Sequence, residues 1–590
     1  MSDLGPFIWQ IADLLRGPYR PNQYGAVILP MTILRRLDAI LEPTRDQVRA
    51  IIKENVGNER LIKAKVRNAT GLTFYNTSDY QFAKPVEGSK MQSLLDDADN
   101  LRENLILYLD SFGEVDVFQH FDFAKEVEKL DNSDRLRLIV DKFAQVALHP
   151  NKVSNAAMGD AYEYIIRKFA EASNETSGDH YTPRDAIRLM VDLLFAEKND
   201  ILTVPGKICD VYDPTAGTGG MLSVAEEHLL AQNPDANIHL FGQEYNEQSY
   251  AICKSDLLAK GQDATNIRFG DTLIEDKFAD RGFDFCLSNP PYGVDWKAEE
   301  REVKAERASM GAGGRFAAGL PSIGDGQMLF LMHMAHKMRP KADGGGRAAI
   351  VLNGSPLFNG GAESGPSEIR RWLLENDFVE AIVALPTNMF FNTGIATYIW
   401  LLDNSKQPER VGKVQLIDGT SYWTKMGRNL GSKSRNIDDG KRKEIVKLYD
   451  AFDSADSAVS KVFNNEDFGY WTITVERPLF DEAGKACTDR KGNPKPDPKK
   501  RDTENVPFTF GKKATGQGER DDVLKEFFDI KIAPYLPDAW VNFERTKVGY
   551  EIPFGRHFFA RVEPRTLDEI DGDLEAQISL MRELLREVEE

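Results

Sequence analysis

Residues 207–232 read KICDVYDPTAGTGGMLSVAEEHLLAQ, and this stretch decides the fold that the sequence predicts. A short apolar run ends at Asp213, a glycine-rich turn follows it, and an apolar segment with helical spacing comes next. This order is typical of a strand, a tight turn and a helix in an open α/β sheet. Ligands bind such sheets at the carboxyl ends of the strands, so the turn after Asp213 is a candidate binding site.

Further apolar runs end in Asn, Asp, Glu or Pro and are separated by segments with helical spacing. They are ANIHLFGQE (236–244), FDFCLSN (283–289), RAAIVLN (347–353), VEAIVALP (379–386) and TYIWLLD (397–403). Strands that alternate with helices predict a doubly wound, mostly parallel α/β sheet of the Rossmann-like kind. We assign this catalytic domain to residues 173–405.

The rest of the chain has other patterns. Apolar residues three and four apart predict a helical N-terminal domain at 1–172. Residues 406–538 form a variable region, whose proline-rich stretch KGNPKPDPKKRDTEN reads as an exposed linker or insertion. Residues 539–590 form a C-terminal segment that ends in an acidic amphipathic helix, either solvated or in contact with another subunit. No internal repeat is evident.

Composition narrows the class of protein. With 590 residues, 41% of them hydrophobic and 28% charged, the chain is typical of a folded protein of about two to four domains. No apolar run is long enough for a membrane span and the start, MSDLGPFIWQ, does not resemble a signal peptide, so we expect a cytoplasmic protein. The four cysteines lack metal-binding spacing, so no metal site is expected.

The net charge of −19 has two interpretations. Acidic charge is common among cytoplasmic proteins. If the substrate is DNA, however, this charge is unfavourable, because Lys and Arg supply most of the affinity for phosphates. A partner would then help to hold the DNA.

A glycine-rich turn alone also fits phosphate binding or a plain tight turn, but the combination with Glu244 predicts an adenosine ligand without a pyrophosphate. Its spacing differs from GxGxxG, no GK[ST] follows it, and Glu244 ends the next strand, where a carboxylate can bind ribose hydroxyls. Asp271 ends another short element and could meet the adenine amino group or simply cap a turn. Tyr181 and Thr182 precede a helix, where they contact the ligand or only cap that helix. The expected cofactor-binding residues are Tyr181, Thr182, Asp213, Pro214, Thr215, Gly217, Thr218, Gly219, Gly220, Glu244 and Asp271.

The tetrapeptide Asn289-Pro290-Pro291-Tyr292 follows a predicted strand at the same edge of the sheet. The prolines stiffen the turn, so the Asn289 side-chain oxygen and the Pro290 carbonyl can converge as two acceptors. Such a pair suits a planar amino group whose lone pair is delocalised, because accepting both N–H bonds returns electron density to the nitrogen. Tyr292 would stack on the target ring. These four residues are the expected catalytic residues; a proline-stiffened loop with a buried tyrosine is the alternative.

With DPTAGTGG as the cofactor motif and SNPPYG as the catalytic motif, the sequence resembles the amino-methyltransferases that use S-adenosylmethionine. Most of the chain resembles the modification (M) subunit of type I restriction-modification systems. Supporting segments include GDHYTPRDAIRLMVDLL, GRFAAGLPSIGDGQMLFLMHM, TGIATYIW and VGYEIPFGRHFF. The resemblance implies methylation of the 6-amino group of adenine in DNA without a metal. It also implies assembly of two such subunits with one DNA-specificity (S) subunit, which a restriction (R) subunit can join.

Other functions use related motifs. Methyltransferases of release-factor glutamine share the tetrapeptide, and guanine methyltransferases of ribosomal RNA use related motifs, but those chains are usually shorter. A scaffold that kept the fold without turnover is a third possibility, although the intact motifs argue against it. The long helical N-terminus and the TGIATYIWLL segment favour DNA.

The segment between residues 297 and 327 is rich in glycine, which predicts a mobile loop rather than a continuous helix. It is either a surface excursion or a lid over the target base. As a lid it would bring Lys304, Arg307 and Arg315 to phosphates. Phe390 or Phe391 could complete an aromatic clamp, although either is as readily a core residue.

Overall fold

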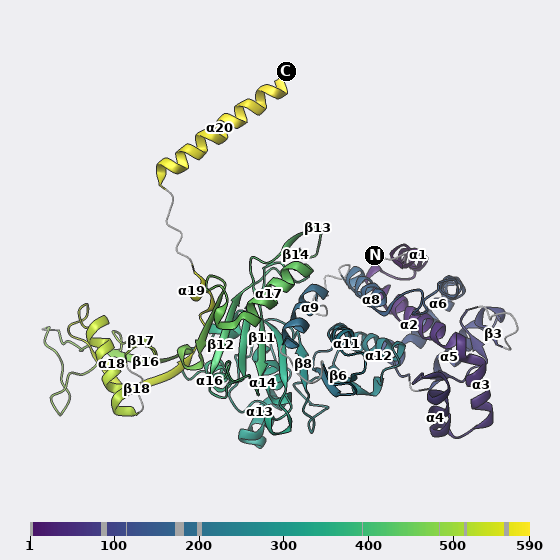
Figure 1. Ribbon diagram of the computed structural model, residues 1–590, viewed down its shortest axis with the longest axis horizontal. Coiled ribbons are helices and arrows are strands. Elements are labelled where there is room, and N and C mark those ends of the chain that lie inside the picture. The colour runs from purple at the N-terminus through teal and green to yellow at the C-terminus, as the bar shows by residue number, and fades with distance from the viewer. Residues whose placement is uncertain are drawn as a thin grey trace. The chain divides into compact units, whose positions relative to one another are not determined.

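The computed structural model describes residues 4–83, 91–113, 115–170, 182–196, 203–391, 393–482, 484–511, 516–559 and 566–589 (Figure 1). The chain divides into two units, Met1–Ile552 and Pro553–Glu590. The first unit contains the predicted α/β sheet and the predicted N-terminal helices. In the described residues no helix is long and apolar enough to cross a membrane.

The predicted α/β sheet has nine strands in the order β15-β12-β10-β11-β9-β8-β5-β6-β7. Strands β7, β6, β5, β8 and β9 are parallel, and only β11 and β15 run against the others within this sheet of described residues. The strands are β5 (Ile208–Asp213), β6 (Asn237–Glu244), β7 (Ile267–Phe269), β8 (Phe285–Ser288), β9 (Arg347–Asn353), β10 (Val379–Ala384), β11 (Thr397–Asp403), β12 (Lys413–Asp418) and β15 (Ser460–Asn464).

Helices cover both faces of the sheet, as alternation along the strands requires. On β5, Val211 belongs to the hydrophobic cluster that contains α9 and α11, whereas the hydroxyl of Tyr212 lies 3.1 Å from Nε2 of His333 in α14. The helices are α9 (Arg184–Leu194), α11 (Gly220–Gln232), α12 (Glu247–Ala259), α13 (Glu300–Met310), α14 (Gln327–Lys337), α15 (Ser355–Phe358), α16 (Gly365–Glu375) and α17 (Asp439–Ala451). A methyltransferase-like α/β sheet is therefore present, as predicted. It continues past residue 405 with β12 and β15.

The N-terminal region is helical, as the spacing of apolar residues predicts. Its helices are α1 (Leu4–Leu15), α2 (Gly25–Leu41), α3 (Arg45–Glu54), α4 (Glu59–Thr70), α5 (Leu101–Asp110), α6 (Phe123–Asn132), α7 (Leu136–Ala144) and α8 (Asn155–Ala170). Four short strands accompany them: β1 (Tyr75–Asn76), β2 (Tyr80–Gln81), β3 (Gln92–Ser93) and β4 (Phe112–Gly113). The central helix α2 is buried along most of its length, and Asp38 inside it is neutralised by Arg35 and Arg45.

Beyond the main sheet, β16 (Gly469–Glu476), β17 (Asp502–Pro507) and β18 (Trp540–Tyr550) form a second sheet with a small core. Helix α18 (Gln517–Lys531) packs on it, and β13 (Thr424–Leu430) pairs with β14 (Lys433–Asn436) in a separate hairpin. The second unit contains α19 (Phe554–Phe558) and α20 (Leu567–Glu589). Helix α20 is the C-terminal helix that the sequence predicts.

Candidate active site

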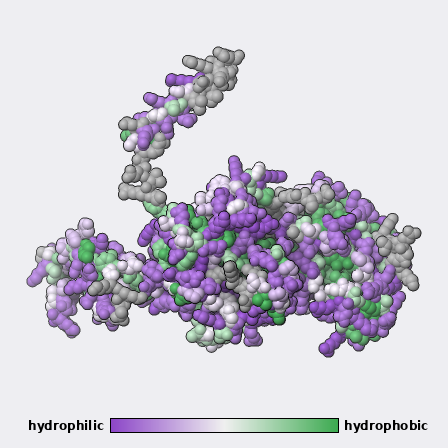
Figure 2. Space-filling view, in the orientation of Figure 1, coloured by the Kyte–Doolittle hydropathy of each residue, from purple (hydrophilic) through white to green (hydrophobic). Residues whose placement is uncertain are grey.

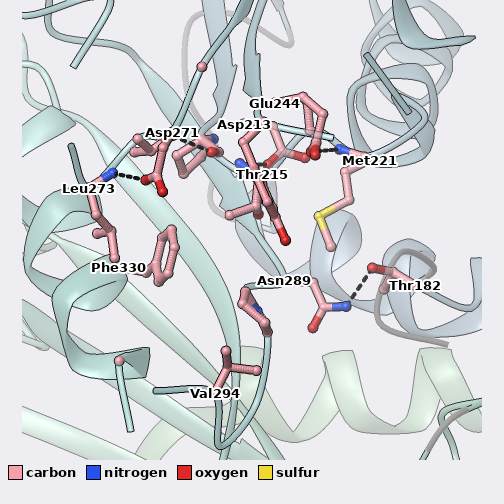
Figure 3. Close-up of a pocket in the computed structure, with 18 of the residues that line it drawn as sticks. Thr182, Asp213, Thr215, Met221, Glu244, Asp271, Leu273, Asn289, Val294 and Phe330 are labelled. Atoms are coloured by element: carbon pink, nitrogen blue, oxygen red, sulfur yellow. Dashed lines mark hydrogen bonds between the residues drawn. The ribbon is translucent and has the colours of Figure 1, made fainter. Parts of the chain in front are cut away.

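A cavity of about 400 Å³ lies where β5, β6, β7 and β8 end, at the carboxyl edge of the sheet (Figure 3). This is the edge at which open α/β sheets bind ligands. Figure 3 shows Asp213, Thr215 and Glu244 gathered on one side of the cavity, with Asn289 and Thr182 facing them. The two predicted motifs therefore contribute to one site.

Most of the predicted residues line this cavity. They are Thr182, Asp213, Pro214, Thr215, Gly217, Thr218, Gly220, Glu244, Asp271, Asn289 and Pro291. Gly219, Pro290 and Tyr292 lie in the same two turns but are not part of the lining. Tyr181 lies outside the described residues.

The glycine turn is held in shape by the carboxylates beside it. The backbone N–H of Thr215 donates to Asp213 Oδ1 at 2.9 Å, and that of Gly217 donates to Glu244 Oε2 at 2.7 Å. Gly217 has a φ of +54° and Gly219 one of +83°, a region that residues with a Cβ rarely adopt. A Cβ on Gly219 would also lie 2.9 Å from Cys253 Sγ, so this glycine permits close packing on α12.

The same two carboxylates are buried without a cationic partner. Asp213 is 1% exposed and Glu244 6%, and neither forms an ion pair with Lys, Arg or His in the described residues. Burial raises the pKa of Asp213 to about 7 and also raises the pKa of Glu244. Uncompensated buried charge is costly, so the site favours a ligand that brings positive charge and hydrogen-bond donors.

Asp271 both caps a turn and faces the cavity. Its Oδ1 accepts the backbone N–H of Leu273 at 2.7 Å, the structural role that its position allows. It also lines the cavity, and the hydroxyl of the next residue, Thr272, donates to the Pro214 carbonyl at 2.6 Å. The two predicted interpretations of Asp271 are therefore compatible, and the turn is fixed to the glycine turn.

The catalytic tetrapeptide begins directly after β8. Asn289 donates its amide N–H to Thr182 Oγ1 at 2.8 Å, which directs the amide nitrogen toward the start of α9. The Tyr292 hydroxyl donates to Asn289 Oδ1, and burial raises the pKa of Tyr292 well above its usual value. The Tyr292 ring meets Phe390 edge-on, at a centroid distance of 5.9 Å, and Phe390 itself is buried. In the described structure nothing donates to the Pro290 carbonyl.

One hydrogen bond joins the two turns directly. The Thr215 hydroxyl, in the glycine turn, lies 2.9 Å from the Ser288 hydroxyl, which immediately precedes Asn289. The cofactor and catalytic motifs thus lie on the same edge of the sheet, and this hydrogen bond holds the two turns beside each other.

The predicted mobile loop at 297–327 is wrong in part. Residues Glu300–Met310 form helix α13, because the glycines begin only after it. Arg315 is buried rather than free for phosphates: it pairs with Glu306 at 2.6 Å and donates to the Thr272 and Leu273 carbonyls. It therefore supports the turn that carries Asp271.

Several lining residues could not be selected from the sequence. Figure 3 shows the Phe330 ring directed toward the cavity beside Leu273. Phe330 lies in α14, where its apolar spacing is that of any core residue, so no local pattern marks it. Trp296 is fixed by its indole N–H to the Ser322 carbonyl at 2.9 Å. Other lining residues not predicted are Ile187, Met221, Tyr245, Val294, Asp295 and Glu299.

The residues present fit S-adenosylmethionine. The cavity has the volume of a small-ligand site, combines apolar walls with a few carboxylates, and carries glycines where the backbone must approach a ligand. The ligand is cationic at its sulfonium and ammonium groups, which suits the two unpaired buried carboxylates. In the described residues no cluster of three metal-ligating side chains is found.

Comparison with protein families agrees with this geometry. Residues 153–472 match the family model described as N-6 DNA methylase, and residues 4–143 match the model described as HsdM N-terminal domain. The first match covers more than half of the chain. The chain belongs to the N-6 DNA methylase family. It is an adenine-specific DNA methyltransferase of the type I modification-subunit class, and S-adenosylmethionine is its cofactor.

Curated relatives of this methylase are similar over much of their length. The type I restriction enzyme MjaIX methylase subunit of Methanocaldococcus jannaschii is 26% identical over 460 residues, which are 76% of this chain and 77% of that protein. The HindI methylase subunit of Haemophilus influenzae is 29% identical over 298 residues, which are 50% of this chain and 59% of that protein. The glutamine- and RNA-directed alternatives receive no support.

Solved structures share the fold. The type I methyltransferase subunit of Streptococcus thermophilus superposes with a TM-score of 0.59 at 23% identity, covering 78% of this chain and 95% of that one. A modification subunit of a putative type I restriction enzyme from Vibrio vulnificus gives a TM-score of 0.50 at 20% identity, covering 82% and 94%.

Proposed function

We propose that the methylase positions the 6-amino group of a target adenine between two acceptors, the Asn289 side-chain oxygen and the Pro290 carbonyl. The observation that supports this most is the hydrogen bond between Thr215 and Ser288, since it ties the acceptor turn to the cofactor turn. Asn289 faces the cavity, and the Pro290 carbonyl receives no hydrogen bond from the described residues. Both acceptors belong to one short turn, which favours convergence on one amino group.

The acceptors act on the lone pair of the amine. In adenine this lone pair is delocalised into the ring, which makes the nitrogen a poor nucleophile. Accepting both N–H bonds holds the amine in place and returns electron density to nitrogen, so orientation and electrostatics replace a strong base. When bound, S-adenosylmethionine supplies the electrophilic methyl group on its sulfonium.

Thr182 and Tyr292 keep Asn289 in its productive orientation. In the described structure the Thr182 hydroxyl accepts from the amide nitrogen, which leaves the amide oxygen for the substrate. Tyr292 donates to that oxygen, which has a second lone pair for the amine. Stacking of the Tyr292 ring on the extruded base remains our prediction.

Different cofactor-binding residues contact different parts of the ligand. Asp213 and Glu244 face the cationic and hydroxyl-bearing parts, because their charges are buried and unpaired. Asp271 and Phe330 face the adenine part, one as a hydrogen-bond acceptor and the other as an apolar wall. Gly217 and Gly219 shape the turn, and Pro214, Thr215, Thr218 and Gly220 complete it.

The working enzyme is a complex in the cytoplasm. Curated relatives are named as methylase subunits of type I restriction enzymes, and one structural neighbour is described as a type I complex assembly. We infer two copies of this chain with one specificity subunit, which the restriction subunit can join, all acting on DNA. The net charge of −19 supports a need for other subunits to hold the DNA.

The test replaces Asn289 by Ala. We expect methyl transfer to fall by about 10³-fold or more, because the amine loses an acceptor in the transition state, while calorimetry shows unchanged cofactor affinity. Asn359→Ala is the matched control, since Asn359 is exposed and its side chain forms no hydrogen bond in the described structure.

Two results would contradict the assignment. Turnover retained by Asn289→Ala in the reconstituted complex would remove Asn289 from the mechanism. Absence of methyl transfer by the unchanged protein, with cofactor and specificity subunit supplied, would favour the scaffold alternative.

A further inference from the structure

Residues 478–501, between β16 and β17, contain an eight-residue repeat, so the expectation that the chain has no internal repeat is wrong. The three copies are PLFDEAGK, ACTDRKGN and PKPDPKKR, each with Asp at its fourth position. Of the two predicted alternatives, an exposed linker or an insertion, the structure favours an insertion, because the backbone of this segment is regularly hydrogen-bonded. Ala483 alone lies outside the described part of it.

A closed ring of backbone hydrogen bonds joins the copies. The N–H of Leu479 donates to the Lys495 carbonyl, that of Lys495 to Cys487, and that of Cys487 to Leu479, each at 2.8 Å. These residues occupy the same position in the three copies. The repeat therefore folds into one unit, which we call the three-turn segment.

Each copy ends in a turn that its aspartate builds. The backbone N–H of Lys485 donates to Asp481, and that of Asn493 to Asp489, both at 2.9 Å. In the third copy, the N–H of Lys499 donates to Asp497 at 3.0 Å. The aspartates thus serve as turn caps. Hydrogen bonding to backbone groups holds the pKa of Asp489 below its usual value.

Ion pairs anchor both ends of the three-turn segment to the neighbouring sheet. Arg477 pairs with Asp538 at 3.1 Å, and Arg501 pairs with the buried carboxylate of Glu476 at 2.9 Å. The segment is therefore a defined extension of the sheet, although it contributes no core of its own. Most of its residues are exposed, including Phe480 at 42%.

The turns present positive charge. Residues 478–501 contain seven Lys and Arg against three Asp and one Glu, in a chain whose net charge is −19. Within the described part of residues 478–501, the exposed Lys and Arg side chains that form no ion pair, hydrogen bond or ring contact are Lys485, Arg490, Lys491, Lys495 and Lys499. Figure 2 shows mostly hydrophilic residues over the lobe that Figure 1 labels with α18 and β16–β18.

A solvated charged surface is the plain alternative, but it explains neither the repeat nor the ring of hydrogen bonds. A segment without a hydrophobic core has little burial to offset the conformational entropy that ordering costs. Its regular backbone is therefore better explained by the Lys and Arg side chains that the turns display. Side chains displayed on a fixed backbone lose less freedom on binding than those on a flexible linker.

We propose that the three-turn segment binds the phosphodiester backbone of duplex DNA, outside the target base. This inference rests on DNA being the substrate. The aspartates of the segment accept backbone N–H groups, so they do not neutralise the exposed cations. Such cations suit the evenly spaced phosphates of a nucleic-acid backbone, whose binding requires no apolar contact surface. The contact would add affinity without sequence preference and compensate for the acidic charge of the chain.

The test neutralises four cations together: Arg490→Gln, Lys491→Gln, Lys495→Gln and Lys499→Gln. Binding of the full-length chain, with the subunits that co-purify, is measured by anisotropy on a mixed-sequence duplex across a KCl series. Each phosphate contact contributes about 0.9 to the slope of log K against log salt, so we expect the slope to fall by about 2 to 4 and Kd at about 100 mM KCl to weaken about tenfold or more.

The matched control removes four exposed lysines elsewhere: Lys443→Gln, Lys447→Gln, Lys525→Gln and Lys531→Gln, on α17 and α18. It should leave the slope nearly unchanged. Methyl transfer at saturating DNA should be kept by both variants, which separates this inference from the proposed catalytic mechanism.

Three results would overturn the proposal. One is an unchanged slope in the four-cation variant, and another is an equal fall in the control. The third is loss of a co-purifying protein while DNA affinity stays the same, because the segment would then bind a protein partner. Absence of methyl transfer by the unchanged chain would instead contradict the proposed function alone.

Discussion

The glycine turn after β5 and the Asn-Pro-Pro-Tyr turn after β8 face one cavity, yet their polar groups are used differently. In the glycine turn, backbone donors are bound by buried carboxylates of the same chain, so Asp213 and Glu244 fix the shape that the ligand meets. In the second turn, the Pro290 carbonyl accepts nothing in the described structure and Asn289 is held by side chains alone. The glycine turn is therefore a preorganised part of the cofactor site, whereas the Asn-Pro-Pro-Tyr turn offers hydrogen-bond acceptors to the substrate.

This difference predicts separable defects. Changes in the glycine turn should alter cofactor affinity first, because its geometry exists before the ligand arrives. Changes around Asn289 should alter the rate of methyl transfer at saturating cofactor, because its acceptors act on the amine.

The largest effect on cofactor affinity is expected for Gly217→Val. The φ of +54° is strained for a β-branched residue, and the turn would lose the N–H contact to Glu244. We expect cofactor Kd to rise by about 100-fold, measured by calorimetry. Gly57→Val is the control, because Gly57 has a φ of +81° but open space around it and no place in the cavity. Equal cofactor affinity in the two variants would contradict the claim that the glycine turn is preorganised for the cofactor.

A smaller effect concerns pH. Burial raises the pKa of Asp213 to about 7, so the carboxyl gains a proton as the pH falls through 7. A cationic ligand favours the charged form, and affinity should therefore rise about tenfold between about pH 6 and 8. In Asp213→Asn the affinity should be lower and the dependence flat. A wild-type profile that matches the Asn variant would exclude Asp213 as the titrating group.

The smallest effect is expected for Thr182→Val. Loss of the hydroxyl removes the acceptor for the Asn289 amide, a single hydrogen bond worth about 1 kcal/mol, so kcat should fall about fivefold with little change in cofactor Kd. Steady-state kinetics and calorimetry give the two quantities separately. If Kd changes and kcat does not, Thr182 contacts the cofactor directly, which is one of the two interpretations that its place in the sequence allows.

The positions of both turns at one edge of the sheet could be predicted from the sequence. The strand that ends at Asp213, the strand that ends at Glu244 and the one before Asn289 are each marked by an apolar run and a polar end, and parallel strands bring such ends to one edge. Local patterns therefore indicated the lining carboxylates and the acceptor turn.

What the sequence did not indicate depends on long-range packing. Phe330 lies in a helix whose apolar residues look alike, and only the sheet decides that its ring faces the cavity. As part of a lid, Arg315 would reach phosphates, but it is buried against Glu306, and the sequence alone does not distinguish an exposed guanidinium from a buried one. The Asp481, Asp489 and Asp497 repeat was visible in principle, but its proline-rich composition resembles that of a linker.

The most direct test is a structure of the complete methylase complex with S-adenosylhomocysteine and a duplex that contains the target adenine. We expect the 6-amino nitrogen of the extruded adenine to lie about 2.7–3.2 Å from both Asn289 Oδ1 and the Pro290 carbonyl, with the sulfur of the ligand facing that nitrogen over the glycine turn. An amino group bound by Asp295 or Glu299 instead, with Asn289 still paired only to Thr182 and Tyr292, would contradict it.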